Sequence, residues 1–273
     1  MTTQNSLRDF SGTLVLVGAG KMGGAMLEGW LALGLDPAKV VVREPQPSAE
    51  ISALGKRGVR INEPAANAGV IVVAIKPQDA ASVVPTLKSL AGENTLVVSI
   101  MAGKTLDFLQ GALPGLAIVR SMPNTPAAIG RGITVAVPNA RVTQDQRALT
   151  GRLLGAVGAV EWVDDESLLD AVTAVSGSGP AYVFLLAESL ARAGAAAGLP
   201  ADLAARLARA TVAGSGELLH RSPQEAATLR QNVTSPGGTT AAALGVLMAD
   251  DGLGPLMQKA IAAATKRSRE LAG

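Results

Sequence analysis

A β-rich run at residues 13–17 leads directly into a glycine-rich turn, and this junction constrains the fold more than any other stretch. After the turn, Met22, Met26 and Trp30 recur at helical spacing until Gly34 ends the pattern. Strand, glycine turn and helix in this order form the setting of a dinucleotide-binding fingerprint. The start of the chain is therefore predicted to open a Rossmann-type α/β half.

The turn itself has the G-x-G-x-x-G spacing. In such a turn the first glycine allows the tight bend, the second lets the backbone approach a pyrophosphate, and the third permits close packing of helix on strand. The diphosphate would rest on the amides at the helix start. The spacing alone is a weak signal in a chain with 31 glycines, but its place between strand and helix favours function. The predicted cofactor contacts here are Gly18, Ala19, Gly20, Lys21, Met22 and Gly23.

The next predicted strand, residues 39–42, ends at Arg43 and Glu44, about 20 residues past the turn. An acidic residue at this place holds the adenosine ribose hydroxyls of NAD, whereas an arginine favours the 2′-phosphate of NADP. Both residue types are present, so the sequence leaves NADPH and NADH open. Ser48 would either contact a phosphate or cap the following helix.

Two continuous apolar runs, residues 69–75 and 95–100, are typical of strands buried on both faces of a parallel sheet. Ligands of open α/β sheets bind beyond the carboxyl ends of the strands. The residues predicted to line the cofactor cleft there are Ala74, Ile75, Lys76, Pro77, Ala102 and Gly103. For Lys76, a plain solvated side chain is the alternative.

Further along, two prolines enclose Asn124 and Thr125. Fixed backbone at both prolines predicts a rigid loop that presents polar groups. Pro123, Asn124 and Thr125 would orient the nicotinamide carboxamide; an ordinary turn is the alternative. A strand at 132–137, a helix at 142–157 and a closing strand at 159–163 are expected to complete this half.

The second half has helical patterns only, at residues 166–175, 181–197, 201–219, 223–232 and 254–271. Helices this rich in Ala and Gly bury little apolar area, and burial stabilises by only about 25 cal/mol per Å². An intertwined dimer would supply the missing burial. The predicted fold class is α/β: an N-terminal Rossmann-like doubly wound sheet at 1–164 and an all-α C-terminal substrate-binding and dimerisation domain at 165–273.

Two polar glycine-containing segments stand out in this half. The first interrupts a helical run where Gly and Pro cost roughly 1 and 3 kcal/mol relative to Ala, so we expect a kink where the two halves meet over a small anionic substrate. The second precedes a helix and offers backbone amides and hydroxyls to a carboxylate-sized anion; no Lys follows its glycines, so it is not a P-loop. The predicted substrate residues are Ser176, Gly177, Ser178, Gly179, Pro180, Ser235, Gly237, Gly238, Thr239 and Thr240.

Composition excludes several classes. Hydrophobic residues make up 48% of the 273 residues and charged residues 17%, which excludes a disordered chain. A net charge of +2, without a basic block, and 2% aromatic residues argue against nucleic-acid binding. With no Cys and one His, His220, neither disulfides nor the usual metal sites are expected. We expect a cytoplasmic protein without a membrane partner or a metal.

Taken together, the motifs resemble those of pyrroline-5-carboxylate reductases, in the family's order over almost the whole chain. The resembling segments are residues 18–25, 74–77, 120–126, 171–182 and 232–240, of which the last two are the most specific. Two departures from the family's pattern are Lys21, where Asn is usual, and Arg43-Glu44, where a Ser- or Asn-containing phosphate contact is commoner.

The resemblance implies an NAD(P)H-dependent reduction of L-1-pyrroline-5-carboxylate to L-proline, the last step of proline biosynthesis, in a homo-oligomer built from dimers. It places the substrate carboxylate on the loop at 235–240, near the interruption at 176–180, and Asn62 on the adenosine ribose. Hydride would pass to C5 of the imine. Because the motifs contain neither His nor Cys, the imine would enter protonated, or be protonated through Thr240 or a water.

Two other functions stay open. A reductase of another small carboxylate, related to 3-hydroxyacid dehydrogenases, would share the architecture, but that resemblance implies a catalytic Lys, and residues 164–198 contain none. A redox-sensing dinucleotide-binding protein without turnover would need the fingerprint but not the anion loop.

Overall fold

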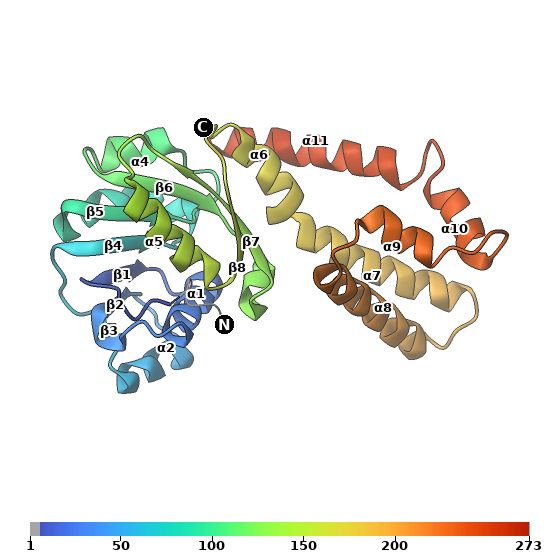
Figure 1. The fold of residues 1–273 in the computed structure, drawn as a ribbon, viewed down its shortest axis with the longest axis horizontal. Helices are drawn as coiled ribbons and strands as arrows, with labels where there is room; N and C mark the ends of the chain where they lie inside the picture. Colours follow the sequence, from blue (N-terminus) through green and yellow to red (C-terminus); the bar gives the residue numbers. More distant parts are fainter. Residues whose placement is uncertain (1–5, 273) are drawn as a thin grey trace. The chain divides into compact units, whose positions relative to one another are not determined.

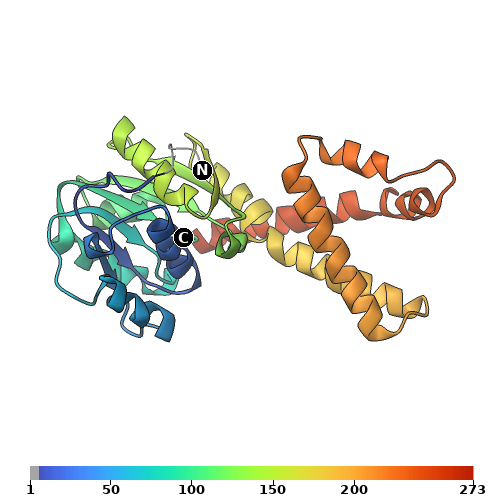
Figure 2. The ribbon, with the colours of Figure 1, turned by 60° about the horizontal axis from the view of Figure 1, so that its bottom comes forward.

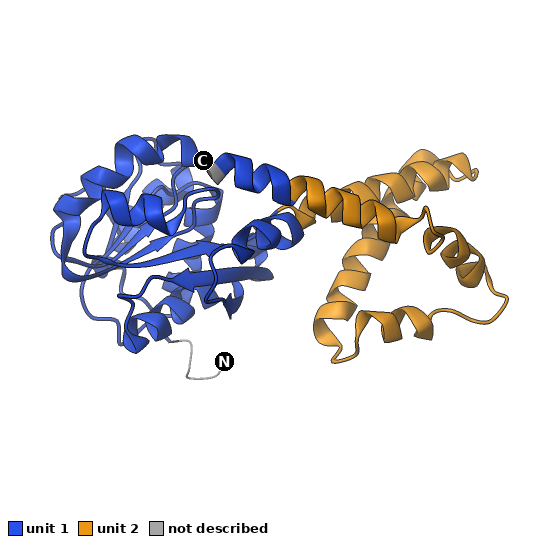
Figure 3. Cartoon of the chain, turned by 90° about the horizontal axis from the view of Figure 1, so that it is seen from above, with its two compact units in different colours: residues 1–177, 265–273 blue, residues 178–264 orange. Residues whose placement is uncertain are grey.

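The computed structural model describes residues 6–272, and the chain divides into two compact units (Figure 3). The first runs up to Gly177 and also contains the segment from Thr265 onward, and the second is Ser178–Ala264. The first unit thus continues past the expected domain boundary at residues 164 and 165.

The first unit is built on one eight-stranded sheet with the order β3-β2-β1-β4-β5-β6-β7-β8 (Figure 1). Its first six strands are parallel in the 3-2-1-4-5-6 order of a doubly wound dinucleotide fold, which confirms the predicted fold class. β7 runs antiparallel to β6 and parallel to β8. The strands are β1 Leu14–Val17, β2 Val40–Arg43, β3 Arg60–Ile61, β4 Ala68–Val73, β5 Ala91–Ser99, β6 Ala117–Met122, β7 Gly132–Pro138 and β8 Gly158–Trp162.

Several of the connecting helices begin at a polar residue whose side chain caps them. The Ser48 hydroxyl accepts from the Ile51 amide at 3.3 Å, so the capping alternative for Ser48 is what the structure shows. Thr143 and Gln146 form a reciprocal capping box. The helices are α1 Lys21–Ala32, α2 Ala49–Leu54, α3 Ala80–Val83, α4 Leu106–Ala112, α5 Gln144–Gly155 and α6 Leu168–Val172, with short 3-10 turns η2 Pro37–Lys39, η3 Gly55–Arg57, η4 Pro77–Asp79, η5 Val84–Leu90 and η6 Thr125–Ile129.

The sheet is covered on both faces, which explains its continuous apolar strands. Leu14 and Leu16 pack in one core cluster, whereas Val15 and Val17 of the same strand pack in the other. Successive side chains of a strand point to opposite faces, so both must be apolar when both are buried. The two-sided burial fixes β1 at the centre of the sheet, where the glycine turn begins.

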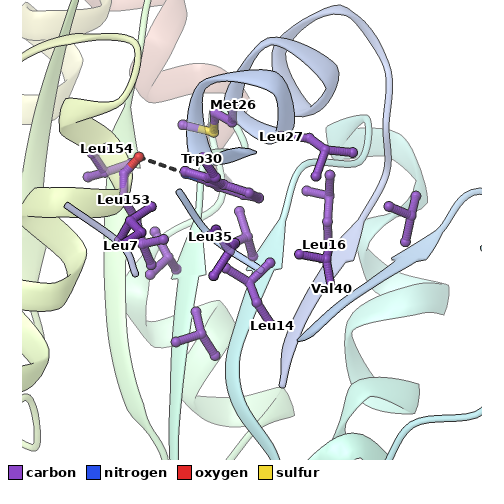
Figure 4. Packing of buried hydrophobic residues seen from close by; sticks show 14 of the residues in the cluster. Leu7, Leu14, Leu16, Met26, Leu27, Trp30, Leu35, Val40, Leu153 and Leu154 are labelled. Carbon is purple, nitrogen blue, oxygen red and sulfur yellow. Dashed lines mark hydrogen bonds between the residues drawn. The ribbon is translucent and has the colours of Figure 1, made fainter. Parts of the chain in front are cut away.

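Trp30 joins α1 to α5 inside the first of these clusters (Figure 4). Its side chain is 1% exposed, and its indole N–H donates to the carbonyl oxygen of Leu153 at 2.8 Å. Leu153 lies in the last turn of α5, where carbonyls have no partner within the helix. The indole therefore caps α5 and anchors α1 at the same time.

The second unit is helical, with α7 Gly179–Ala196, α8 Ala201–Arg221, α9 Ala226–Asn232, α10 Thr239–Leu247 and most of α11 Leu253–Ala272. α7 and α8 form a hairpin whose turn contains Gly198 at a φ of +101°. Gly194 lets α8 approach closely, because a Cβ there would lie 3.3 Å from the Cβ of Ala204.

This unit buries little of its own apolar surface. Among its described residues only Ala204 and Ala208 are buried, whereas Phe184 is 68% exposed and Val246 73% exposed. The helical stretch Leu168–Ala196 is also long and apolar enough to cross a membrane by length and composition, with 11% of its apolar window buried. The observed exposure agrees with the sequence argument that these helices need a covering partner.

The predicted kink has a different cause from the one expected. Between α6 and α7 the backbone forms a π-helical turn, η7 Thr173–Gly177. In it the Thr173 and Ser176 hydroxyls donate to the carbonyls of Leu169 and Val172, at 2.7 and 3.0 Å. Pro180 lies in the first turn of α7, where its missing N–H breaks no hydrogen bond. The π turn, and not a proline inside a helix, interrupts the run.

The end of α11 returns to the first unit and lies beside α6 (Figures 1 and 2). The Ser268 hydroxyl donates to Asp170 at 2.7 Å, and Arg269 lies 3.7 Å from the same carboxylate. Leu271 packs against Gly103, whose missing Cβ would stand 3.3 Å from the Leu271 carbonyl oxygen. The last turn of α11 is thus a structural part of the first unit.

Candidate functional site

The glycine turn between β1 and α1 has the geometry that its sequence predicts. Gly18 has a φ of +91°, and a Cβ on it would stand 2.7 Å from the carbonyl oxygen of Ala74. A Cβ on Gly23 would overlap the carbonyl oxygen of Gly18. Around Gly20, by contrast, nothing lies within 4 Å of the Cβ position. Two glycines therefore close the turn, and the third leaves open space beside the backbone.

This open space lies at the amino end of α1. Gly20 is the N-cap, no side chain accepts from the first amides of the helix, and its first turn contains no acidic residue. Unpaired amides and the positive end of a twelve-residue helix attract an anion. The residues present thus fit the pyrophosphate of a dinucleotide.

Glu44 lies against the same turn. Its Oε2 accepts from the Ala19 amide at 2.9 Å, and its Oε1 accepts from the Gln46 amide at 3.2 Å. Asn62 fixes the Glu44 backbone from the other side, accepting from its amide at 2.9 Å and donating to its carbonyl at 2.8 Å. Asn62 itself is exposed and has a φ of +56°. The structure therefore gives Asn62 a positioning role for Glu44.

The ends of β4 and β5 complete this edge of the sheet. The Ala74 amide donates to Val17 at 2.7 Å, and the Ile100 amide donates to Val73 at 3.0 Å, so both strand ends lie beside the glycine turn. Lys76 is exposed and precedes η4. The predicted residues of these strand ends, 74–77 and 102–103, thus share the edge with Gly18 and Glu44.

In the loop at Pro123, Asn124 and Thr125, the amide side chain has a structural partner. Asn124 Oδ1 accepts from the Ile133 amide at 2.9 Å and ties the loop to the start of β7. Pro123 is buried, and Thr125 begins η6. The Asn124 oxygen is therefore already engaged within the first unit.

An ion pair between β6, which leads into this loop, and Glu166 was not predicted from the sequence. Arg120 donates to Glu166 Oε1 at 2.6 Å, and the Leu106 amide donates to the same oxygen at 2.7 Å. The Arg120 side chain is 7% exposed and that of Glu166 27%. The two residues are 46 positions apart, so only the fold brings them together. The pair holds β6 to the segment that enters α6.

In the second unit, the loop at 235–240 forms a tight turn into α10. Gly237 has a φ of +69°, and the Gly238 amide donates to the Ser235 carbonyl at 3.0 Å. Gly238 is the N-cap of α10, and no side chain caps this helix. Among the described residues, no hydrogen bond involves the hydroxyl of Thr239 or Thr240. Free amides and free hydroxyls at one helix start can hold a carboxylate.

The segment 176–180, which interrupts the helical run, is divided between the two units. The Ser176 hydroxyl is used within the helix, and a Cβ on Gly177 would stand 2.6 Å from the Met122 Cε. Ser178, Gly179 and Pro180 begin α7 in the second unit. Ser176 and Gly177 therefore have clear packing roles in the π turn.

Two known families match different parts of the chain. The family described as "Pyrroline-5-carboxylate reductase dimerisation" matches residues 166–271, and "NADP oxidoreductase coenzyme F420-dependent" matches residues 13–103. The first match covers the helical half together with α6, and the second covers the glycine turn, Glu44 and the ends of β4 and β5.

Individual proteins match over almost the whole chain. A pyrroline-5-carboxylate reductase of Synechocystis sp. is 42% identical, covering 94% of this chain and 97% of that protein. A solved pyrroline-5-carboxylate reductase of Coxiella burnetii has a TM-score of 0.89 at 35% identity, covering 97% of this chain and 100% of that one. That of Plasmodium falciparum, solved with NADP bound, has a TM-score of 0.79 at 28% identity, covering 96% and 99%.

Proposed function

Because the chain belongs to the pyrroline-5-carboxylate reductase family, we propose that it reduces L-1-pyrroline-5-carboxylate to L-proline with NADPH or NADH. The family's enzymes are NAD(P)H-dependent oxidoreductases. The observation that carries the proposal is the uncapped, glycine-lined helix start at Gly20, with Glu44 fixed beside it on the same edge of a doubly wound sheet.

The first unit would hold the cofactor. The pyrophosphate would lie on the amides of the glycine turn, and Glu44 and the strand ends at 74–77 and 102–103 would surround the rest. When bound, the nicotinamide supplies the hydride. We assign the exposed Lys76 and the backbone of Pro123–Thr125 to orienting the cofactor.

The substrate carboxylate would bind the loop at 235–240. The free amides of Thr239 and Thr240 lie at the positive end of α10, and the Gly237–Gly238 backbone allows close approach. Reduction adds a hydride to C5 and leaves a secondary amine, so the ring nitrogen must carry a proton. In the part of the chain that the structure describes, the Thr240 hydroxyl has no hydrogen-bond partner and could hydrogen-bond that nitrogen, which would make positioning the main contribution of the protein.

The function is tested by mixing the full chain, reduced cofactor and the imine and following the loss of reduced-nicotinamide absorbance. Oxidation coupled to proline formation is expected. Cofactor binding without turnover would favour the redox sensor, and turnover only with other small carboxylates would favour the dehydrogenase-like reductase.

The role of Thr240 is tested by Thr240→Ala, with Thr239→Ala as the matched control on the same helix start. If Thr240 holds the ring nitrogen, its variant loses at least about tenfold in kcat/KM and the control loses less. An unchanged kcat/KM in Thr240→Ala removes Thr240 from the mechanism.

The family match at 166–271 and the exposed apolar helices of the second unit also support an oligomer built from dimers. We propose this assembly, a functional boundary near residues 164 and 165, a cytoplasmic location, and the absence of nucleic-acid, membrane and metal partners. Light scattering of the full chain at several concentrations tests the assembly, and a monomer at micromolar concentration would contradict it.

A further inference from the structure

We infer that Glu44 makes this enzyme prefer NADH over NADPH. The inference rests on the proposed function, which leaves the two cofactors open. It concerns the adenosine ribose, whose 2′ position carries a hydroxyl in NADH and a phosphate in NADPH. A carboxylate at the end of the second strand accepts hydrogen bonds from ribose hydroxyls but repels a phosphate.

The first step is that the Glu44 carboxylate is held in place before any ligand binds. The Ala19 amide holds one oxygen at 2.9 Å and the Gln46 amide holds the other at 3.2 Å. Asn62 grips the backbone of the same residue through two hydrogen bonds. A side chain fixed at both ends cannot swing away from an incoming phosphate without losing these contacts.

The second step is that no cation neutralises this carboxylate. No ion pair involves Glu44 within the part of the chain that the structure describes. Arg43 is adjacent in sequence, but it lies two positions after Val41 on β2, and side chains two positions apart share a face of the sheet. Val41 packs in the core on the opposite face of the sheet from Val42. The backbone of Arg43 belongs to the same turn, because its carbonyl oxygen accepts from the Gly18 amide at 2.9 Å.

The third step concerns the Ser48 hydroxyl, the group after β2 that could have bound the 2′-phosphate of NADPH. Ser48 accepts from the Ile51 amide as the cap of α2, and its hydroxyl hydrogen-bonds Glu50. That hydrogen bond is the main reason that the pKa of Glu50 lies below its ordinary value. The segment after β2 therefore has the Ser48 hydroxyl engaged as a helix cap, and a second carboxylate, Glu50, follows it in the first turn of α2.

The test measures binding to the full chain by calorimetry, without substrate, using NADH, NADPH, ADP-ribose and 2′-phospho-ADP-ribose. The wild-type chain is expected to bind the two ligands without the 2′-phosphate at least about tenfold more tightly than their phosphorylated counterparts. Because the repulsion is between charges, the ratio should shrink as salt is raised.

Glu44→Gln keeps an acceptor for the Ala19 amide and removes the charge, so it should bring the NADPH-to-NADH ratio of Kd values close to one. The matched control is Glu93→Gln, which makes the same change on an exposed residue at the amino end of β5 and should leave the ratio unchanged. Melting curves of each variant verify folding.

Equal or tighter binding of NADPH by the wild-type chain overturns the inference, as does an unchanged ratio in Glu44→Gln. Loss of NADPH binding in Arg43→Gln would show instead that Arg43 holds the phosphate. If neither dinucleotide binds, the proposed function fails with it, whereas binding of both with NADPH preferred removes the NADH preference alone.

Discussion

Replacing Trp30 by Phe should destabilise the first unit by roughly 2–4 kcal/mol. The change removes the indole N–H that caps the Leu153 carbonyl at 2.8 Å, and an unsatisfied buried acceptor costs about 1–3 kcal/mol. The smaller ring also leaves a void, because Trp30 itself is only 1% exposed, and this void adds about 1 kcal/mol or more.

The matched control is Trp162→Phe. Trp162 is half-buried on the edge strand β8. The Arg147 guanidinium lies over its ring, with the guanidinium carbon 4.5 Å from the ring centre. A Phe ring keeps an aromatic face for the cation, so the cost should stay below about 1 kcal/mol. The chain contains two Trp residues, so each variant keeps one as a fluorescent reporter within the first unit.

The assay is urea unfolding followed by Trp fluorescence at one fixed protein concentration, since association shifts apparent stability. A lower midpoint at an unchanged slope reports lost stability. If Trp30→Phe costs no more than Trp162→Phe, the indole does not cap α5 and the reasoning is wrong.

Three smaller changes test other parts of the structure. Gly18→Ala should abolish measurable dinucleotide binding in calorimetry, because Gly18 has a φ of +91° and a Cβ there meets backbone; retained affinity would contradict the tight turn. Gly151→Ala in α5 should raise the unfolding free energy by up to about 1 kcal/mol, because nothing lies within 4 Å of the new methyl; a loss in urea unfolding would show hidden crowding. Ser167→Ala should raise the pKa of Asp165 measured by NMR, because hydrogen bonds from Ser167 lower that pKa in the wild-type chain. The stability that these bonds contribute is present above the pKa of unfolded Asp165 and is lost as the pH falls through its folded pKa. An unchanged pKa in the variant would show that Ser167 is not the cause.

The sequence predicts well those elements whose pattern is local. The strand before Gly18, the helix after it and the possible cap at Ser48 follow from spacing and residue type, and the structure confirms the fold class that they indicate. The sequence pattern does not predict β6, which leads into the prolines at 123 and 126.

Contacts between distant residues were beyond the sequence. Nothing in the spacing joins Arg120 to Glu166, or the Trp30 indole to a helix carbonyl, because both depend on how the layers pack. The π turn before Pro180 was also missed, since Ala-rich sequence gives no sign of a locally wider helix. The site predictions, from Gly18 to Thr240, stay predictions until binding is measured.

The return of α11 to the first unit affects the order in which contacts of that unit can form during synthesis. Ser268 and Leu271, which contact Asp170 and Gly103, leave the ribosome after the whole of the second unit, Ser178–Ala264. The contacts that these two residues make with the rest of the first unit can therefore form only after the second unit has been synthesised. A stop codon shortly before residue 265 would remove a piece of the first unit as well as the end of the second.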